Sequence, residues 1–175
     1  PIPQGEVATT PQEAKKIAEK IGKPVAIKSQ VWAGGRGKAG GIKFAEHAID
    51  AEIVANEILG SEIKKLRVEK VLVEEKLDID KEYYIGVIVD SSREVRAPVI
   101  MFSTEGGMDI ESVPSEKIAT MTVDVLRGFR LYDALNLALK LKVPTAHLPG
   151  VAQAISGLFK TFKEYNCRTA EINPL

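Results

Sequence analysis

The sequence predicts an α+β protein of two lobes, and three observations lead to this class. First, two segments with helical periodicity alternate with short β-branched segments before residue 60. Second, three closely spaced strand candidates follow, which is typical of an antiparallel sheet. Third, two amphipathic helical segments and a last strand complete the chain. We therefore expect a small lobe over residues 1–69 and a larger α+β lobe, cut short at its C-terminal end, over residues 70–175.

The first helix carries its own start and stop signals. Thr10 is placed to cap its N-terminus, Pro11 suits the first helical position, and Glu13 completes a capping box. Apolar residues then recur on one face, and Gly22 follows as a C-terminal stop. This pattern predicts a helix of about three turns.

The next elements of the first lobe surround a glycine-rich segment. The run at residues 24–31 is apolar and β-branched, as expected of a strand. Residues 42–44 alternate apolar and charged side chains, which is strand periodicity, and helical periodicity resumes only over about residues 46–59. The glycine-rich segment is therefore expected to join two strands.

The second lobe is predicted from strand candidates, a hairpin turn and two helices. Residues 90–92 are typical of a turn between two strands, and both helices are expected to pack on the resulting sheet. The expected strands cover residues 68–75, 82–89, 97–102 and 167–172, and the expected helices lie over about residues 131–141 and 151–162.

Composition narrows the class of protein. The chain is 45% hydrophobic and 27% charged, which suits a globular fold. Its 24 basic residues balance 24 acidic ones, so no overall charge indicates nucleic acid or an anionic membrane, and no apolar run could span a bilayer. The single cysteine, Cys167, fits a reducing compartment such as the cytoplasm. Because the chain starts at Pro1 and stops on an apolar run, we interpret it as an excised part of a longer protein.

The segment GRGKAG at residues 35–40 satisfies the pattern G-x-G-x-x-G, which alone is a weak signal. A dinucleotide-binding fingerprint would need a helix to begin at the third glycine, whereas a strand is expected here. A Walker A loop would need Ser or Thr where Ala39 stands. The segment is better interpreted as a flexible hairpin tip, rich in Arg36, Lys38 and backbone N–H groups, that folds over phosphates.

Three charged residues near the strands have two interpretations each. Lys28 lies in the middle of an apolar strand, so it either points to water from an edge strand or has an anionic partner such as a phosphate. Glu74 and Glu82 bracket a polar link between two strands. That link is either a solvated turn or a place where backbone groups meet a base and an acid holds ribose hydroxyls. Spacing alone leaves both alternatives open.

Two polar residues of the last strand form the remaining candidate site. Glu171 and Asn173 alternate, which places both side chains on one face of a strand. Carboxylate and amide oxygens near phosphates are ligands that Mg²⁺ accepts. The alternative is a merely polar strand edge.

Taken together, several segments carry a family resemblance: Lys28, AGGRGKAGG, VLVEEKLDIDKEYYIGVIVD, STEGGMDIE and EINPL. In this order they resemble the ATP-grasp region of succinyl-CoA synthetase β subunits, and the likeness covers essentially the whole chain. The resemblance implies two α+β lobes that clamp ATP or ADP. It also implies a ligase of the tricarboxylic acid cycle that interconverts succinate, CoA and ATP with succinyl-CoA, ADP and phosphate. The expected location is the cytoplasm, or the mitochondrial matrix in a eukaryote.

The resemblance assigns nucleotide-binding roles to residues of this chain. It implies that Lys28 and the segment Gly35-Arg36-Gly37 contact the phosphates. Glu74 and the backbone of Leu77 would bind the adenine edge, and Glu82 would bind the ribose. Phosphoryl transfer is chiefly positioning and charge neutralisation, which agrees with a lysine, a basic loop and a metal rather than a strong nucleophile.

The resemblance also implies a metal ligand, a catalytic residue and partners. Asn173 would bind Mg²⁺, and Glu171 matches the position thought to face a phosphorylated histidine. Pro3 matches an entrance position where the family tends to have proline when it prefers ATP. The histidine and the CoA site would belong to an α subunit, and the substrate would be a dicarboxylate. A second metal carboxylate would lie beyond the end of this chain, so the fragment alone is expected to be inactive.

Three alternatives remain at this point. The chain could belong to another ATP-grasp acyl-CoA ligase, one that uses malate or a citrate-cleaving relative. It could be a nucleotide-binding module without chemistry. A redox dinucleotide domain is disfavoured by the strand expected after Gly41.

Overall fold

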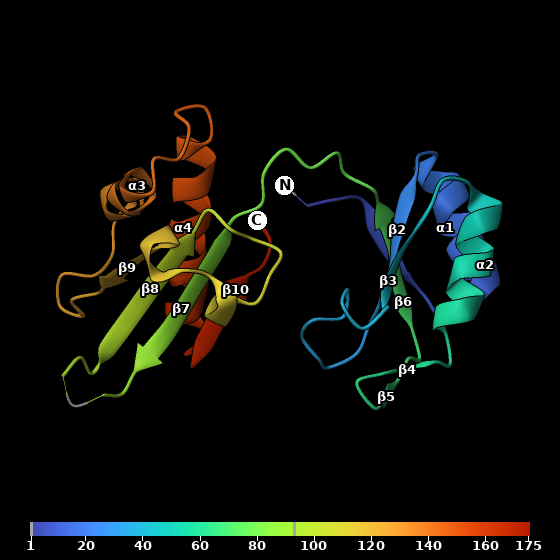
Figure 1. Cartoon of the computed structure of the whole chain (residues 1–175), viewed down its shortest axis with the longest axis horizontal. Helices are drawn as coiled ribbons and strands as arrows, with labels where there is room; N and C mark the ends of the chain where they lie inside the picture. The colour runs from blue at the N-terminus through green and yellow to red at the C-terminus, as the bar shows by residue number, and fades with distance from the viewer. Residues whose placement is uncertain (1, 93) are drawn as a thin grey trace. The chain divides into compact units, whose positions relative to one another are not determined.

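The computed structural model describes residues 2–92 and 94–175. It divides into two compact units, of which the first ends at Asp78 and the second covers Ile79–Leu175 (Figure 1). Each unit has its own sheet and its own hydrophobic core. In the described ranges, no helix is both long enough and apolar enough to cross a membrane.

The first unit is built on a four-stranded antiparallel sheet in the order β1-β6-β2-β3. Helices α1 and α2 pack against one face of this sheet (Figure 1). Ile27 and Val73 of the sheet belong to the core that these helices cover. A short hairpin, β4-β5, follows α2. The bounds are β1 Gly5–Ala8, α1 Pro11–Ile21, β2 Val25–Ser29, β3 Ile42–Ala45, α2 Ala48–Ile58, β4 Glu62–Ile63, β5 Leu66–Arg67 and β6 Val71–Glu75.

The start and stop signals of α1 are confirmed. The Thr10 hydroxyl accepts a hydrogen bond from the Glu13 N–H at 3.2 Å, and the Glu13 carboxylate accepts one from the Thr10 N–H at 3.3 Å. Hydrogen bonds from the backbone and the hydroxyl of Thr9 hold the pKa of the Glu13 carboxyl below its usual value. Gly22 ends the helix with a φ of 68°, a left-handed conformation that glycine adopts without steric penalty.

The second unit is built on a four-stranded antiparallel sheet in the order β10-β7-β8-β9. Helices α3 and α4 pack on one face of this sheet, as the sequence predicts. The core between them and the sheet includes Ile85, Phe102, Leu137 and Ile155. The bounds are β7 Tyr84–Asp90, β8 Ala97–Ser103, the 3₁₀ turns η1 Ile110–Ser112 and η2 Ser115–Lys117, β9 Ile118–Thr122, α3 Leu131–Lys140, α4 Leu148–Glu164 and β10 Thr169–Ile172.

The sequence placed the boundary between the units at residue 69, whereas the first unit of the structure ends at Asp78. The difference arises because strand β6 belongs to the first sheet. The sequence assigned residues 68–75 to the second sheet, next to the strand that follows them. In the structure β6 lies between β1 and β2 in the first sheet. Strand periodicity identifies β6 as a strand but carries no information on its partners, and β1, which completes that sheet, was not predicted.

Candidate functional site

The glycine-rich segment joins β2 to β3, two paired antiparallel strands, so its interpretation as a hairpin loop is confirmed. Gly35 and Gly40 have φ values of 65° and 76°, which other residues adopt only with strain. Within the described ranges, the N–H groups of Gly35, Arg36 and Gly37 have no hydrogen-bond acceptor in the chain. Trp32, the only tryptophan, stands fully exposed at the start of this loop. The loop therefore offers unpaired N–H groups to a ligand.

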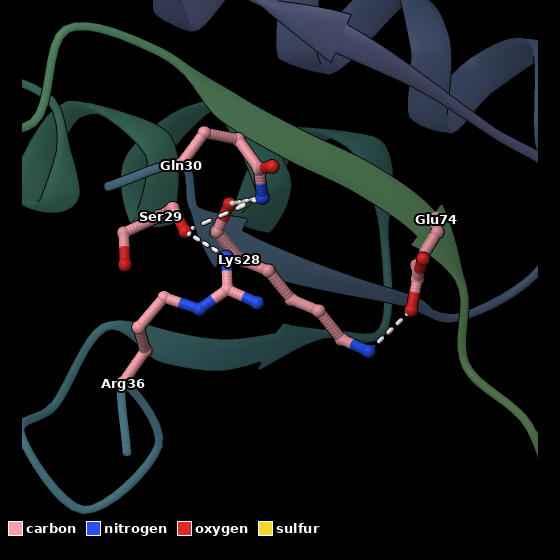
Figure 2. A network of polar contacts seen from close by, with 5 residues as sticks. All are labelled: Lys28, Ser29, Gln30, Arg36 and Glu74. Carbon is pink, nitrogen blue, oxygen red and sulfur yellow. Dashed lines mark hydrogen bonds and ion pairs between the residues drawn. The ribbon is translucent and has the colours of Figure 1, made fainter. Parts of the chain in front are cut away.

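Lys28 lies on an interior strand and has an anionic partner (Figure 2). Its ammonium group forms a close ion pair with the Glu74 carboxylate, and the two side chains keep 32% and 14% of their exposure. Glu74 is directly opposite Ala26, two residues before Lys28, so both charged side chains lie on one face of the sheet. Their neighbours Ile27 and Val73 point to the opposite face, into the core beneath the helices. The interpretation of Lys28 as an edge-strand lysine is therefore wrong.

Arg36 brings a second cation to this strand (Figure 2). Its Nη1 donates a hydrogen bond to the Ser29 carbonyl oxygen at 2.8 Å, and this contact folds the loop back toward β2. The Gln30 side chain donates to the Lys28 carbonyl oxygen at 3.0 Å. These contacts gather a lysine, an arginine and the free loop amides at the end of β2, where they can bind a polyanion.

Lys64 is a third cation near the loop, and sequence reasoning missed it. A Cβ atom added to Gly35 would lie only 3.1 Å from the Lys64 Nζ. Lys64 and Lys65 form the turn of the β4-β5 hairpin, with φ values of 50° and 66°. For the part of the chain that the structure describes, Lys64 has no ion-pair partner. In the sequence this residue lies in a polar connection, and only the fold brings it to the loop.

Glu171 lies on β10 directly opposite Gly86 of β7. The Tyr84 hydroxyl donates a hydrogen bond to the Glu171 Oε2 at 3.4 Å. Burial of the tyrosine, and then the nearby Glu171 and Glu111 carboxylates, raise the pKa of Tyr84 to about 12, so its hydroxyl stays protonated at neutral pH. A Cβ on Gly86 would lie 2.4 Å from the Tyr84 oxygen. The glycine thus provides the space through which the tyrosine reaches Glu171, a contact that the sequence alone did not reveal.

Asn173 follows β10, and both ends of its amide contact one turn of the backbone. Its Oδ1 accepts a hydrogen bond from the Gly107 N–H at 2.8 Å, and its Nδ2 donates to the Met108 carbonyl at 2.9 Å. Among the described residues, no group of three or more His, Cys, Asp and Glu side chains is placed to hold a metal. The Oδ1 of Asn173 is a neutral oxygen that uses one lone pair for the Gly107 N–H, so its second lone pair can bind a metal.

The structure distributes the predicted site residues over both units. The first unit contains Lys28, the loop segment Gly35-Arg36-Gly37, Glu74 and the exposed Leu77, whereas the second contains Glu82, Glu171 and Asn173. Lys28, Glu74 and Arg36 are brought together within the first unit. In both sheets the helix-covered face forms the core. Lys28 and Glu74 in one sheet, and Tyr84 in the other, lie on the face without helices.

Comparison with known proteins identifies the family of the chain. A family model described as an ATP-grasp domain matches residues 1–175. The chain is 46% identical over 176 residues to the β subunit of an ADP-forming succinate–CoA ligase from Methanothermobacter thermautotrophicus, covering 99% of this chain and 47% of the relative. It is 45% identical to the β subunit of a GDP-forming succinate–CoA ligase from Thermus thermophilus, covering 100% of this chain and 46% of that relative. The chain thus spans about half the length of these relatives.

Solved structures agree on the fold. A dinucleotide-forming acetyl-CoA synthetase from Ca. Korarchaeum cryptofilum matches with a TM-score of 0.77 at 19% identity, over 99% of this chain and 79% of that one. An ATP citrate lyase from Methanothrix soehngenii matches with a TM-score of 0.69 at 21% identity, over 97% of this chain and 40% of that one. The predicted α+β fold and the family resemblance are both confirmed: this chain belongs to the ATP-grasp family of nucleotide-binding domains, as the region found in succinate–CoA ligase β subunits.

Proposed function

We propose that this chain is the nucleotide-binding region of an ADP-forming succinate–CoA ligase. The complete enzyme would interconvert succinate, CoA and ATP with succinyl-CoA, ADP and phosphate, through a phosphohistidine carried by an α subunit. The observation that carries the proposal is the cluster of Lys28, Arg36 and three unpaired loop N–H groups at the end of β2. Such a cluster meets the electrostatic requirement of phosphate binding.

The phosphates would be held by charge and by backbone amides together. Lys28 would turn from Glu74 toward a phosphate oxygen, while the N–H groups of Gly35, Arg36 and Gly37 would donate to neighbouring oxygens. Lys64, already beside Gly35, would add a third positive charge. Because phosphoryl transfer depends on positioning and charge neutralisation, these groups suffice without a nucleophile in this chain.

The base and the ribose are assigned to individual residues of the segment 74–82. We assign the adenine edge to Glu74 and to the backbone of Leu77, and the ribose to Glu82. In the described ranges, the backbone groups of Leu77 have no partner in the chain, and its side chain is 52% exposed, so the link is accessible to a base. We expect adenine to be preferred over guanine, because Pro3 matches an entrance position where the family tends to have proline when it prefers ATP.

The side chains fit Mg²⁺ only as a partner of the nucleotide. Asn173 offers one neutral oxygen that already accepts a hydrogen bond, and Mg²⁺ needs near-octahedral oxygen coordination. Phosphate oxygens would therefore supply most of the ligands, and the metal would neutralise charge on the phosphates when bound. Glu171, aligned by Tyr84, is the proposed residue that faces the phosphohistidine.

The partners and the location follow from the same proposal. The α subunit would supply the histidine and the CoA site, a dicarboxylate would be the substrate, and the enzyme would work in the cytoplasm or a mitochondrial matrix. A citrate-cleaving or malate-using ligase is the second candidate. This candidate is kept because an ATP citrate lyase shares the fold of this chain.

Calorimetric titration of the chain with ADP, GDP and NADH tests the nucleotide site. ADP should bind, and NADH should not. A complete β subunit with the same 175 residues should then transfer phosphate from ATP to an added α subunit. Binding of NADH in preference to ADP would contradict the nucleotide assignment. ADP binding without phosphotransfer in the complete enzyme would indicate a module without chemistry.

A further inference from the structure

A second pair of glycines, Gly106 and Gly107, follows β8 and packs directly against the segment that carries Glu82. The Gly106 N–H donates a hydrogen bond to the Glu82 carbonyl at 3.1 Å. A Cβ on Gly106 would lie 2.6 Å from the Tyr83 carbonyl oxygen, closer than any real contact of this kind. The two backbone segments therefore approach so closely that only glycine fits between them.

Gly107 provides the space that the Glu82 carboxylate occupies. A Cβ on Gly107 would lie 2.4 Å from the Glu82 Oε2 and 3.3 Å from its Oε1. Gly107 also has a φ of 70°, which residues with a side chain adopt only with strain. Any substitution here would displace the carboxylate.

Asn173 fixes the same turn through two hydrogen bonds. Its amide accepts from the Gly107 N–H at 2.8 Å and donates to the Met108 carbonyl at 2.9 Å. These two bonds hold the peptide groups that precede Gly107 and follow Met108 in one orientation. The turn is therefore held by Asn173 and also packs against the Glu82 side chain.

We infer that Asn173 and the Gly106-Gly107 turn are positioning residues for Glu82, and that they set the selectivity of the site for a ribose with free hydroxyl groups. Asn173 performs this role through its amide hydrogen bonds, whether or not it also binds a metal. The inference rests on the proposed function, in which Glu82 binds the ribose. It adds that the residue expected to bind metal also controls recognition of the sugar.

The test compares ADP with 2′,3′-dideoxy-ADP by calorimetry, with EDTA present so that no metal contributes. The wild-type chain should bind ADP about tenfold more tightly or better, because hydrogen bonds from ribose hydroxyls to a carboxylate are charge-assisted. Gly107→Ala should reduce this ratio to within about twofold, because the new methyl group displaces the carboxylate. The ratio of the two dissociation constants is the readout, since a general loss of affinity leaves it unchanged.

Gly128→Ala is the matched control. Gly128 lies in the same unit with a φ of 76°, and a Cβ there would meet no atom within 4 Å. This variant carries the backbone strain without displacing Glu82, so it should keep the wild-type ratio. A loss of the ratio in Gly128→Ala as well would overturn the inference, because strain alone would then explain the effect.

Asn173→Ala is the second variant, and it decides the question if Gly107→Ala fails to fold. It removes both hydrogen bonds to the turn and adds no steric conflict, so the ratio should again fall to within about twofold in EDTA. A folded Asn173→Ala that keeps the wild-type ratio overturns the inference and leaves the ribose assignment of Glu82 intact. Equal binding of both nucleotides by the wild-type chain overturns the Glu82 assignment and the inference together.

Discussion

Replacing Lys28 by methionine removes the ammonium group that pairs with Glu74 and keeps most of the aliphatic volume of the side chain. If Lys28 also binds a phosphate, Lys28→Met should weaken ADP binding by about 1.5–3 kcal/mol, the range of a hydrogen bond to a charged group. That range corresponds to about 10- to 150-fold in the dissociation constant. Glu74 keeps only 14% of its side-chain exposure, so the loss of its partner should also lower stability to urea.

Glu74→Gln provides the opposite perturbation. In the ligand-free chain the Glu74 carboxylate forms an ion pair with Lys28 (Figure 2) and therefore repels an incoming anion. A partly exposed ion pair contributes at most about 1 kcal/mol, so its removal should tighten binding of a simple phosphate by about fivefold or less. Pyrophosphate is the appropriate ligand, because it has no base and therefore avoids the proposed contact between Glu74 and adenine.

Calorimetric titration with pyrophosphate and with ADP distinguishes the two effects. Lys28→Met should weaken the binding of both ligands, whereas Glu74→Gln should strengthen the binding of pyrophosphate and weaken the binding of ADP. Lys23→Met is the control, because Lys23 pairs at 2.6 Å with Glu75, the next residue of β6, which points to the opposite face. Equal pyrophosphate affinity in Lys28→Met and Lys23→Met would refute the reasoning.

Three further outcomes are expected. Gly41→Ala should lower the urea midpoint, because a Cβ there would lie 2.4 Å from the buried Ser29 hydroxyl, whereas Gly34→Ala, with no atom within 4 Å, should change it little. Since burial raises the pKa of Tyr84 to about 12, against about 10 in an unfolded chain, its stabilising contribution is complete below pH 10 and is lost as pH rises toward 12. Tyr84→Phe should therefore flatten the alkaline fall in stability, and an unchanged slope would contradict the shift. ADP should bind more tightly than GDP in a competition assay, and the reverse order would disprove the assignment based on Pro3.

Local signals in the sequence predicted most of the elements correctly. The capping box of α1 and the strand signals on both sides of the glycine loop depend on neighbours within a few residues, so the sequence alone contains them. The apolar and β-branched run of β2 placed Lys28 in a strand. It gave no sign that this strand is interior, because strand order depends on pairing between distant segments.

The candidate site was predicted as residue types and not as contacts. The resemblance supplied roles for Glu82, Glu171 and Asn173, which remain proposals. The contacts of Tyr84 with Glu171 and of Gly107 with Glu82 join residues far apart in the chain, and each depends on a glycine whose missing side chain leaves space. Such a space cannot be recognised from the sequence, because it depends on which segment of the chain packs against the glycine in the fold.

The position of β6 between β1 and β2 has a consequence for how the chain folds during synthesis. Gly5 pairs with Glu74, so β1 has no neighbour in its sheet until β6 has left the ribosome. A nascent chain that ends before Val71 can form α1 and the hairpin of β2 and β3, but its sheet stays open at the centre. High contact order of this kind slows folding, because a long loop must close before the contacts form. The unpaired edge of β2 is then the surface that a chaperone would have to shield.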